Sequence, residues 1–121
     1  MNKLKFVSLL ILLVISCDTK EHKLGDKFII YKGDYKYPMS IGLDVGDGGV
    51  QGLLDGDFVE YGYDKKFITV RTRSNEYFYI EKSKVLADPA EPLNRGQGPF
   101  SYTQFNNISK IKKLPKLKQI Q

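Results

Sequence analysis

Residues 57–82 decide the fold class, and they read DFVEYGYDKKFITVRTRSNEYFYIEK. The stretch contains three runs rich in β-branched and aromatic residues, at 57–63, 66–73 and 76–82. Only two residues separate each run from the next, and so short a connection between alternating runs is typical of a tight hairpin. The stretch therefore predicts an antiparallel meander of three strands.

The same alternation predicts the core, because successive side chains of a strand point to opposite faces. One face is expected to bury Val59, Tyr61, Tyr63, Ile68, Val70, Phe78 and Ile80. The opposite face carries Phe58, Phe67, Tyr77 and Tyr79. Since these four side chains are aromatic, a second layer is expected to cover part of their face. Either the strands before the meander or a helix after it would supply that layer.

The segment before the meander gives a weaker strand signal. Residues 27–31 lie between turn formers and predict a strand, and residues 35–41 predict an irregular edge strand because Pro38 cannot donate to a ladder. Residues 42–56 contain six glycines and three aspartates. We expect them to form mainly loop and turn, with one short strand near Val50.

Residues 101–113 predict one helix after the meander. Ser101 and Gln104 fit a capping box, in which each side chain bonds the other residue's main-chain amide. Apolar residues then recur at three-residue spacing, at Tyr102, Phe105, Ile108 and Ile111. Residues 87–99, with three prolines and two glycines, predict a connector. The fold class is thus mainly β (α+β), as a small antiparallel sheet or a partly open barrel or sandwich with a C-terminal helix.

Length and composition exclude several classes of protein. The 121 residues suffice for one small domain. A single His and a single Cys exclude a disulfide framework and a Cys/His zinc site within one chain. The formal charge of +5 includes two lysines in the first five residues, so it gives little reason to expect a nucleic-acid partner.

The first 16 residues have the pattern of an export signal. Two lysines precede an apolar run at 6–15 that only Ser8 interrupts, and this run is about half the roughly 20 residues that a membrane-spanning helix needs. The run ends in Val14-Ile15-Ser16-Cys17, which resembles the lipobox of bacterial lipoproteins. The resemblance implies cleavage between Ser16 and Cys17 and acylation of the Cys17 thiol, with chains such as palmitate.

Acylation at Cys17 would fix the protein to a bilayer outside the cytoplasm, at the cell envelope, because two or three acyl chains anchor a protein far more firmly than one. Residues 17–24 are expected to be a polar tether, followed by a single β-rich domain at 25–121. His22 falls in this tether, where no neighbour is expected to fix its geometry. No catalytic or metal role is therefore expected for His22.

A wider resemblance rests on residues 59–68, 77–80 and 98–100, with Phe105 downstream. These segments resemble a family of small bacterial lipoproteins of unknown function. The likeness covers about half the chain. It implies the location and the β-rich fold, and it supplies no catalytic residues.

Charge is distributed unevenly along the chain. Residues 37–64 contain six acids and no base, whereas the part after Glu91 contains six bases and no acid. Asp44 and Asp47 are weak candidates for a calcium loop, although aspartates beside glycines more commonly stabilise turns. The basic end suits either anionic lipid head groups or a solvated helix end. The two segments are also able to pair with each other, within one fold or between molecules.

Two further groups suggest binding or catalysis. Five tyrosines suit either an aromatic platform for a glycan or peptide or a packed second layer: Tyr31, Tyr35, Tyr37, Tyr77 and Tyr79. Asp55 and Asp57 are the carboxylates of a possible hydrolase. Ser83 and Lys84 are expected on opposite faces of a strand, which argues against a nucleophile–base pair.

The sequence as a whole predicts an exported lipoprotein, held in the bilayer through Cys17, that acts as a non-enzymatic binding or structural module without a cofactor. Its expected partner is another envelope protein. One alternative is an immunity-type inhibitor that uses the acidic segment against a basic toxin surface. The other is an envelope hydrolase that uses clustered carboxylates.

Overall fold

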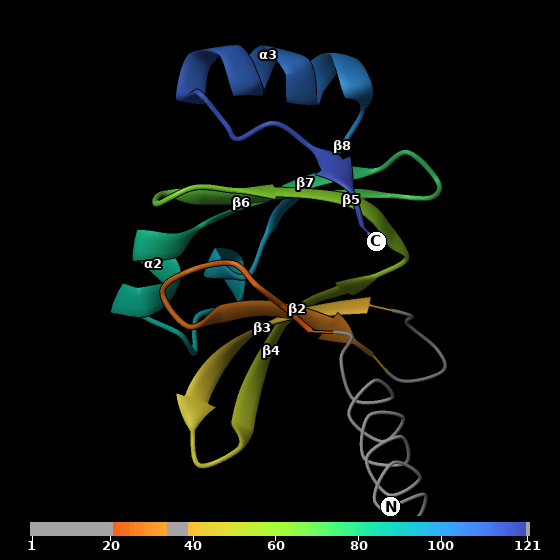
Figure 1. The fold of residues 1–121 in the computed structure, drawn as a ribbon. Helices are drawn as coiled ribbons and strands as arrows, with labels where there is room; N and C mark the ends of the chain where they lie inside the picture. The colour runs from red at the N-terminus through yellow and green to blue at the C-terminus, as the bar shows by residue number, and fades with distance from the viewer. Residues whose placement is uncertain (1–20, 34–38, 121) are drawn as a thin grey trace, which may run out of the picture.

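The computed structural model describes residues 21–33 and 39–120, and its strands there form two antiparallel sheets (Figure 1). The first sheet has the order β1-β2-β3-β4, with β1 at His22–Lys23, β2 at Phe28–Lys32, β3 at Met39–Gly46 and β4 at Gly49–Gly56. The second has the order β8-β7-β6-β5-β9, with β5 at Phe58–Tyr63, β6 at Phe67–Thr72, β7 at Tyr77–Glu81, β8 at Gln97–Phe100 and β9 at Lys118–Gln119. The helical elements are α2 at Lys82–Ala87, the 3₁₀ turn η1 at Pro92–Asn94, and α3 at Tyr102–Lys112. The predicted fold class, mainly β with a C-terminal helix, is confirmed.

The elements lie in three layers. Figure 1 shows α3 above one face of the five-stranded sheet and the four-stranded sheet below the other. The main core joins the two sheets and α2: Leu24, Phe28, Ile30, Ile41, Leu43, Leu53, Phe58, Tyr61, Ile68, Val70, Ile80 and Val85. A second cluster lies on the α3 side and contains Phe67, Tyr77, Phe105 and Leu114. Of the two candidates for the layer over the aromatic face, α3 covers Phe67 and Tyr77, and the earlier strands pack on the opposite face of the meander.

The meander is confirmed as β5, β6 and β7, but a bulge changes which side chains β5 buries. The β5–β6 register shifts between Phe58 and Glu60, so the alternation inverts there. Phe58 is 4% exposed and joins the main core, whereas Val59 is only half-buried. Tyr63, at the end of β5, is 42% exposed. The core positions predicted for Val59 and Tyr63 are therefore wrong, and Phe58 belongs inside.

The glycine-rich segment is a hairpin, and the loop predicted over 42–56 is wrong. Strands β3 and β4 pair along most of their length around a turn at Asp47 and Gly48. Both turn residues have positive φ, 53° and 75°, as a two-residue hairpin turn requires. Gly42 allows a close cross-strand contact, because a Cβ there would lie 2.5 Å from Cγ1 of Val50. The edge strand predicted at 35–41 lies partly outside the described residues, and its end from Met39 belongs to β3.

The domain begins earlier than the predicted boundary at residue 25. His22 and Lys23 form β1, which pairs with β2, and Leu24 is fully buried. The last part of the predicted tether is therefore part of the fold. Ser83 and Lys84, expected on a strand, lie on α2. No helix in the described part of the chain has both the length and the apolar character needed to cross a membrane.

The predicted helix is confirmed, with its capping box. The Ser101 hydroxyl accepts from the Gln104 amide at 3.2 Å, and the Gln104 side chain accepts from the Ser101 amide at 3.0 Å. Phe105 is buried, but Ile111 is 82% exposed, so its place on the apolar stripe is wrong. Three residues advance an α-helix by about 300°, so a strict three-residue spacing drifts steadily round the helix.

Candidate functional site

Some predicted site residues lie outside the described residues. These are Ser16 and Cys17 of the lipobox and Tyr35 and Tyr37 of the aromatic group. Lipidation and cleavage therefore stay predictions.

The weak metal candidates act as turn residues. The carboxylate of Asp44 accepts a hydrogen bond from the amide of Gly46 at 2.9 Å, and Asp47 occupies the hairpin turn. Both side chains are exposed. Within residues 21–33 and 39–120, no group of three or more acidic, His or Cys side chains is placed to hold a metal ion. The bonding of Asp44 matches the turn-stabilising interpretation of these aspartates.

Both carboxylates of the hydrolase alternative already have a partner. Asp55 accepts a hydrogen bond from the hydroxyl of Ser40 at 2.5 Å, and Asp57 forms an ion pair with Arg73 at 2.9 Å. Glu60 likewise pairs with Arg71. Arg71 lies on β6 and Arg73 in the turn that follows it. No ion pair in the described part of the chain joins the acidic segment to the basic C-terminal segment.

The described tyrosines of the predicted aromatic platform are divided between the two sheets. Tyr31 lies on β2 of the four-stranded sheet. Tyr77 and Tyr79 lie on β7 and belong to the cluster beneath α3, where Tyr77 is 8% exposed. Packing under a second layer thus accounts for these two tyrosines, and they do not form one surface with Tyr31.

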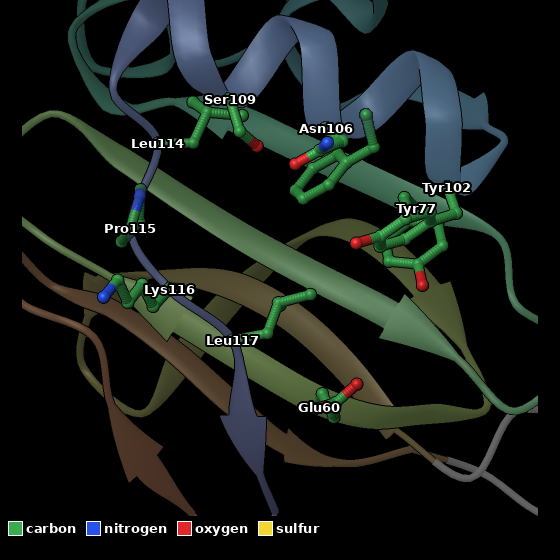
Figure 2. A pocket seen from close by; sticks show the side chains of 10 residues that line it. Glu60, Tyr77, Tyr102, Asn106, Ser109, Leu114, Pro115, Lys116 and Leu117 are labelled. Carbon is green, nitrogen blue, oxygen red and sulfur yellow. The ribbon is translucent and has the colours of Figure 1, made fainter.

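A cleft opens beside these packed tyrosines, between α3 and the five-stranded sheet. It has a volume of about 330 Å³. Figure 2 shows its lining residues: Glu60, Tyr77, Tyr102, Phe105, Asn106, Ser109, Leu114, Pro115, Lys116 and Leu117. The helix supplies one wall, β5 and β7 supply the floor, and residues 114–117 close the far side.

Three aromatic rings line one end of the cleft. The Tyr77 ring stacks on Phe105 with centroids 5.0 Å apart, and Tyr102 meets Tyr77 at 6.0 Å and 59°. Phe105 and Tyr77 are buried, whereas Tyr102 is 65% exposed. A large exposed ring that rests on a fixed aromatic pair is suited to bury a partner's side chain.

Polar groups line the cleft beside the rings, and Lys116 is the base in its lining. In Figure 2, the amide of Asn106 and the hydroxyl of Ser109 lie along the helix wall. Exposed lysines follow on the same segment, at Lys110, Lys112, Lys113, Lys116 and Lys118. The only acid in the lining, Glu60, has Arg71 as its counter-ion. The cleft therefore suits an apolar or aromatic group carried on an acidic partner.

A second pocket surrounds Lys82, a residue that no sequence motif marks. It has a volume of about 310 Å³ and is lined by Leu24, Gly25, Asp26, Tyr63, Asp64, Lys65 and Lys82. The Lys82 side chain is 3% exposed, and its ammonium lies 3.7 Å from the Asp26 carboxylate. Burial lowers the pKa of Lys82 below its ordinary value, although Asp26 and Asp64 oppose this shift.

Sequence reasoning missed both Tyr102 as a surface residue and Lys82 as a buried one. The position of Tyr102 could have indicated its exposure, because a first-turn residue at the edge of an apolar helix face is often partly exposed. Nothing local marks Lys82, since its burial depends on the turn at residues 24–26.

Comparison of the chain with models of known families, with curated proteins and with solved structures finds no match.

Proposed function

We propose that this protein is an exported lipoprotein, anchored through acylated Cys17, that acts without catalysis as a binding module at the cell envelope. The binding site is the cleft between α3 and the five-stranded sheet. Its partner is another envelope protein that offers an acidic segment with an aromatic or large apolar side chain. The lipobox at 14–17 is the basis for the anchor, and the cleft is the basis for the partner.

The observation that carries the proposal is the position of Tyr102. Its ring is 65% exposed and lies beside Tyr77, on which Phe105 stacks. Tyrosines in such positions dominate the energetics of many protein interfaces. The lysines along the same segment would steer an acidic partner and make its association sensitive to salt.

The test compares two exposed residues of α3. Tyr102→Ala removes the cleft ring, whereas Ile111→Ala removes an exposed side chain nine residues on, on the opposite side of the helix. Both lipidated variants are used to capture partners from solubilised envelope membranes. We expect Tyr102→Ala to weaken capture about tenfold or more, as loss of an interface hot spot does, and Ile111→Ala to retain it. Equal capture of partners by both variants would show that the cleft is not the binding site.

The anchor has a separate test. Cys17→Ala is expected to leave an unlipidated protein that is uncleaved or released, because the thiol is the group that takes the lipid. Metabolic labelling with a fatty acid, followed by detergent phase partitioning, measures this directly. Normal processing and continued partitioning of Cys17→Ala into the detergent phase would contradict the anchor.

The acidic hairpin supports a second candidate, the immunity-type inhibitor. Asp44 and Asp47 are exposed, and they flank the 60% exposed Val45. Neither aspartate forms an ion pair with another described residue. An inhibitor that docks by this hairpin would lose its partner in the Asp47→Asn variant, whereas a partner held in the cleft would remain bound.

A further inference from the structure

The two ends of the described chain meet on one side of the molecule. The ring of His22, on β1, lies 5.7 Å from the ring of Tyr61 on β5. Lys118 of β9, which pairs with the edge of β5 opposite β6, lies in register with Tyr61. The first described strand and the basic C-terminal strand therefore both contact the same tyrosine.

A pocket of about 380 Å³ lies at this meeting point. It is lined by His22, Tyr61, Lys118 and Gln119. An imidazole, an ammonium, a side-chain amide and a phenol hydroxyl can each donate a hydrogen bond, so all four lining residues carry a donor group. A set of donors around one concave site matches the oxygens of a phosphate group.

The ammonium of Lys118 is held in place without a carboxylate. It lies 5.4 Å from the centre of the Tyr61 ring and 5.7 Å from that of Tyr63, and these two rings stack in parallel at 6.3 Å. Ring contacts of this kind fix a cation but leave its N–H donors free. Within the described residues, Lys118 has no ion-pair partner.

Neighbouring acids do not cancel this charge. Glu60 pairs with Gln119 across the strands, but its carboxylate is bound to Arg71. Glu21 is exposed next to His22. Three exposed lysines lie in the same two segments, Lys23 beside His22 and Lys116 and Lys118 in the C-terminal segment, so the formal charge of these segments is positive.

The pocket also lies close to the proposed anchor. Four residues separate Cys17 from His22 in the sequence. A chain spans at most about 3.6 Å per residue, so the Cα atoms of Cys17 and His22 are no more than about 18 Å apart. A lipid on Cys17 would hold this pocket within reach of the head groups.

We infer that the pocket of His22, Tyr61, Lys118 and Gln119 binds the phosphodiester of an anionic phospholipid in the membrane that carries the protein. This inference rests on the proposed anchor. The contact would set the orientation of the domain, with β1 and β9 toward the bilayer. The cleft beside α3 would then be presented to a partner from a fixed direction.

The experiment places the full lipidated chain in nanodiscs of phosphatidylcholine alone or with added phosphatidylglycerol. The reactivity of each lysine toward a water-soluble acylating reagent is read by mass spectrometry. We expect phosphatidylglycerol to lower the reactivity of Lys118 about fivefold, the change that fits one lysine held at an anionic surface. Lys110, on α3, is the internal control and should keep its reactivity. The imidazole signal of His22, the only histidine, should shift in the same discs.

Two lysine variants distinguish binding at this pocket from general electrostatic attraction to an anionic bilayer. Lys118→Gln should abolish the His22 shift, whereas Lys110→Gln, which removes the same charge elsewhere, should preserve it. Inorganic phosphate added to phosphatidylcholine discs should have no effect, and an equal His22 shift there would overturn the assignment to lipid. A chain that stays in the discs but shows no response to phosphatidylglycerol overturns the head-group site alone. A chain that does not remain in the discs refutes the anchor instead.

Discussion

The ammonium of Lys82 donates a hydrogen bond to the main-chain carbonyl oxygen of Leu24, a residue 58 positions earlier. This contact ties the start of the domain to the junction of β7 and α2. It also places a charged group where its side chain is 3% exposed, with the Phe28 ring at 5.7 Å. Burial of the ammonium form costs free energy, and the Leu24 carbonyl and the Asp26 carboxylate offset part of that cost.

The lowered pKa of Lys82 predicts a pH dependence of stability. The unfolded chain keeps its proton up to a pKa near 10.5, while the folded protein releases it at a lower pH. Between these values the unfolded state binds more protons, so the free energy of unfolding rises with pH. The stability of the unchanged protein relative to Lys82→Met should therefore increase as the pH rises toward 10.5.

Urea unfolding at several pH values measures this difference. Lys84→Met, at an exposed position on the same helix, is the control and should show no such trend. A difference that shrinks as the pH rises would mean that Leu24 and Asp26 stabilise the ammonium by more than burial costs.

The close approach of Gly62 to Lys116 predicts that a small residue is needed here for residues 114–117 to pack on β5. A Cβ at this position would overlap the main-chain carbonyl oxygen of Lys116, and it would lie 2.9 Å from the hydroxyl of Thr69. Gly62→Ala should therefore push residues 114–117 away from β5 and destabilise the protein by about 1–3 kcal/mol, as overpacking does. Gly52→Ala is the matched control, because a Cβ there meets nothing within 4 Å.

Hydrogen exchange locates the effect of Gly62→Ala. The amide of Ile120, which donates to Val59 at 3.1 Å, should exchange faster in Gly62→Ala than in Gly52→Ala. Unchanged protection at Ile120 would show that the segment does not depend on this close approach.

Local patterns were sufficient to predict the meander and α3. In both, strand alternation or a capping box specifies an element within a few neighbouring residues. The β3–β4 hairpin was missed because six glycines resemble a loop in composition, whereas Gly42 serves a close cross-strand contact with Val50. Strands β8 and β9 were missed because they are short and depend on pairing with β7 and β5.

The cleft was harder to predict than the elements around it. Tyr102 and Phe105 follow from the helix pattern, but residues 114–117 complete the site only because the chain turns back after α3. That turn depends on Lys113, which caps the helix in the left-handed region at a φ of 57°. A lysine carries little local signal for that conformation, unlike the glycine usual at such caps.

The capping box of α3 predicts a measurable loss of stability when Ser101 is replaced. Ser101→Ala removes the acceptor for the Gln104 amide and should lower the free energy of unfolding by about 1 kcal/mol. Thr103→Ala, in the exposed first turn, should be neutral or slightly stabilising, since alanine favours helix more than threonine. Thermal unfolding by circular dichroism compares the two. Equal midpoints would show that α3 is held by packing alone.

Phe105 and Ile111 lie on the same helix with opposite environments, and they predict how much of the stability of α3 comes from burial. Phe105 is 6% exposed and stacks on Tyr77, whereas Ile111 is 82% exposed. Phe105→Ala should cost about 3–5 kcal/mol through lost burial and the cavity left behind. Ile111→Ala should change stability by about 0.5 kcal/mol or less. Urea midpoints at unchanged slope give both values, and a loss below about 1 kcal/mol for Phe105→Ala would mean that α3 is not packed on the five-stranded sheet.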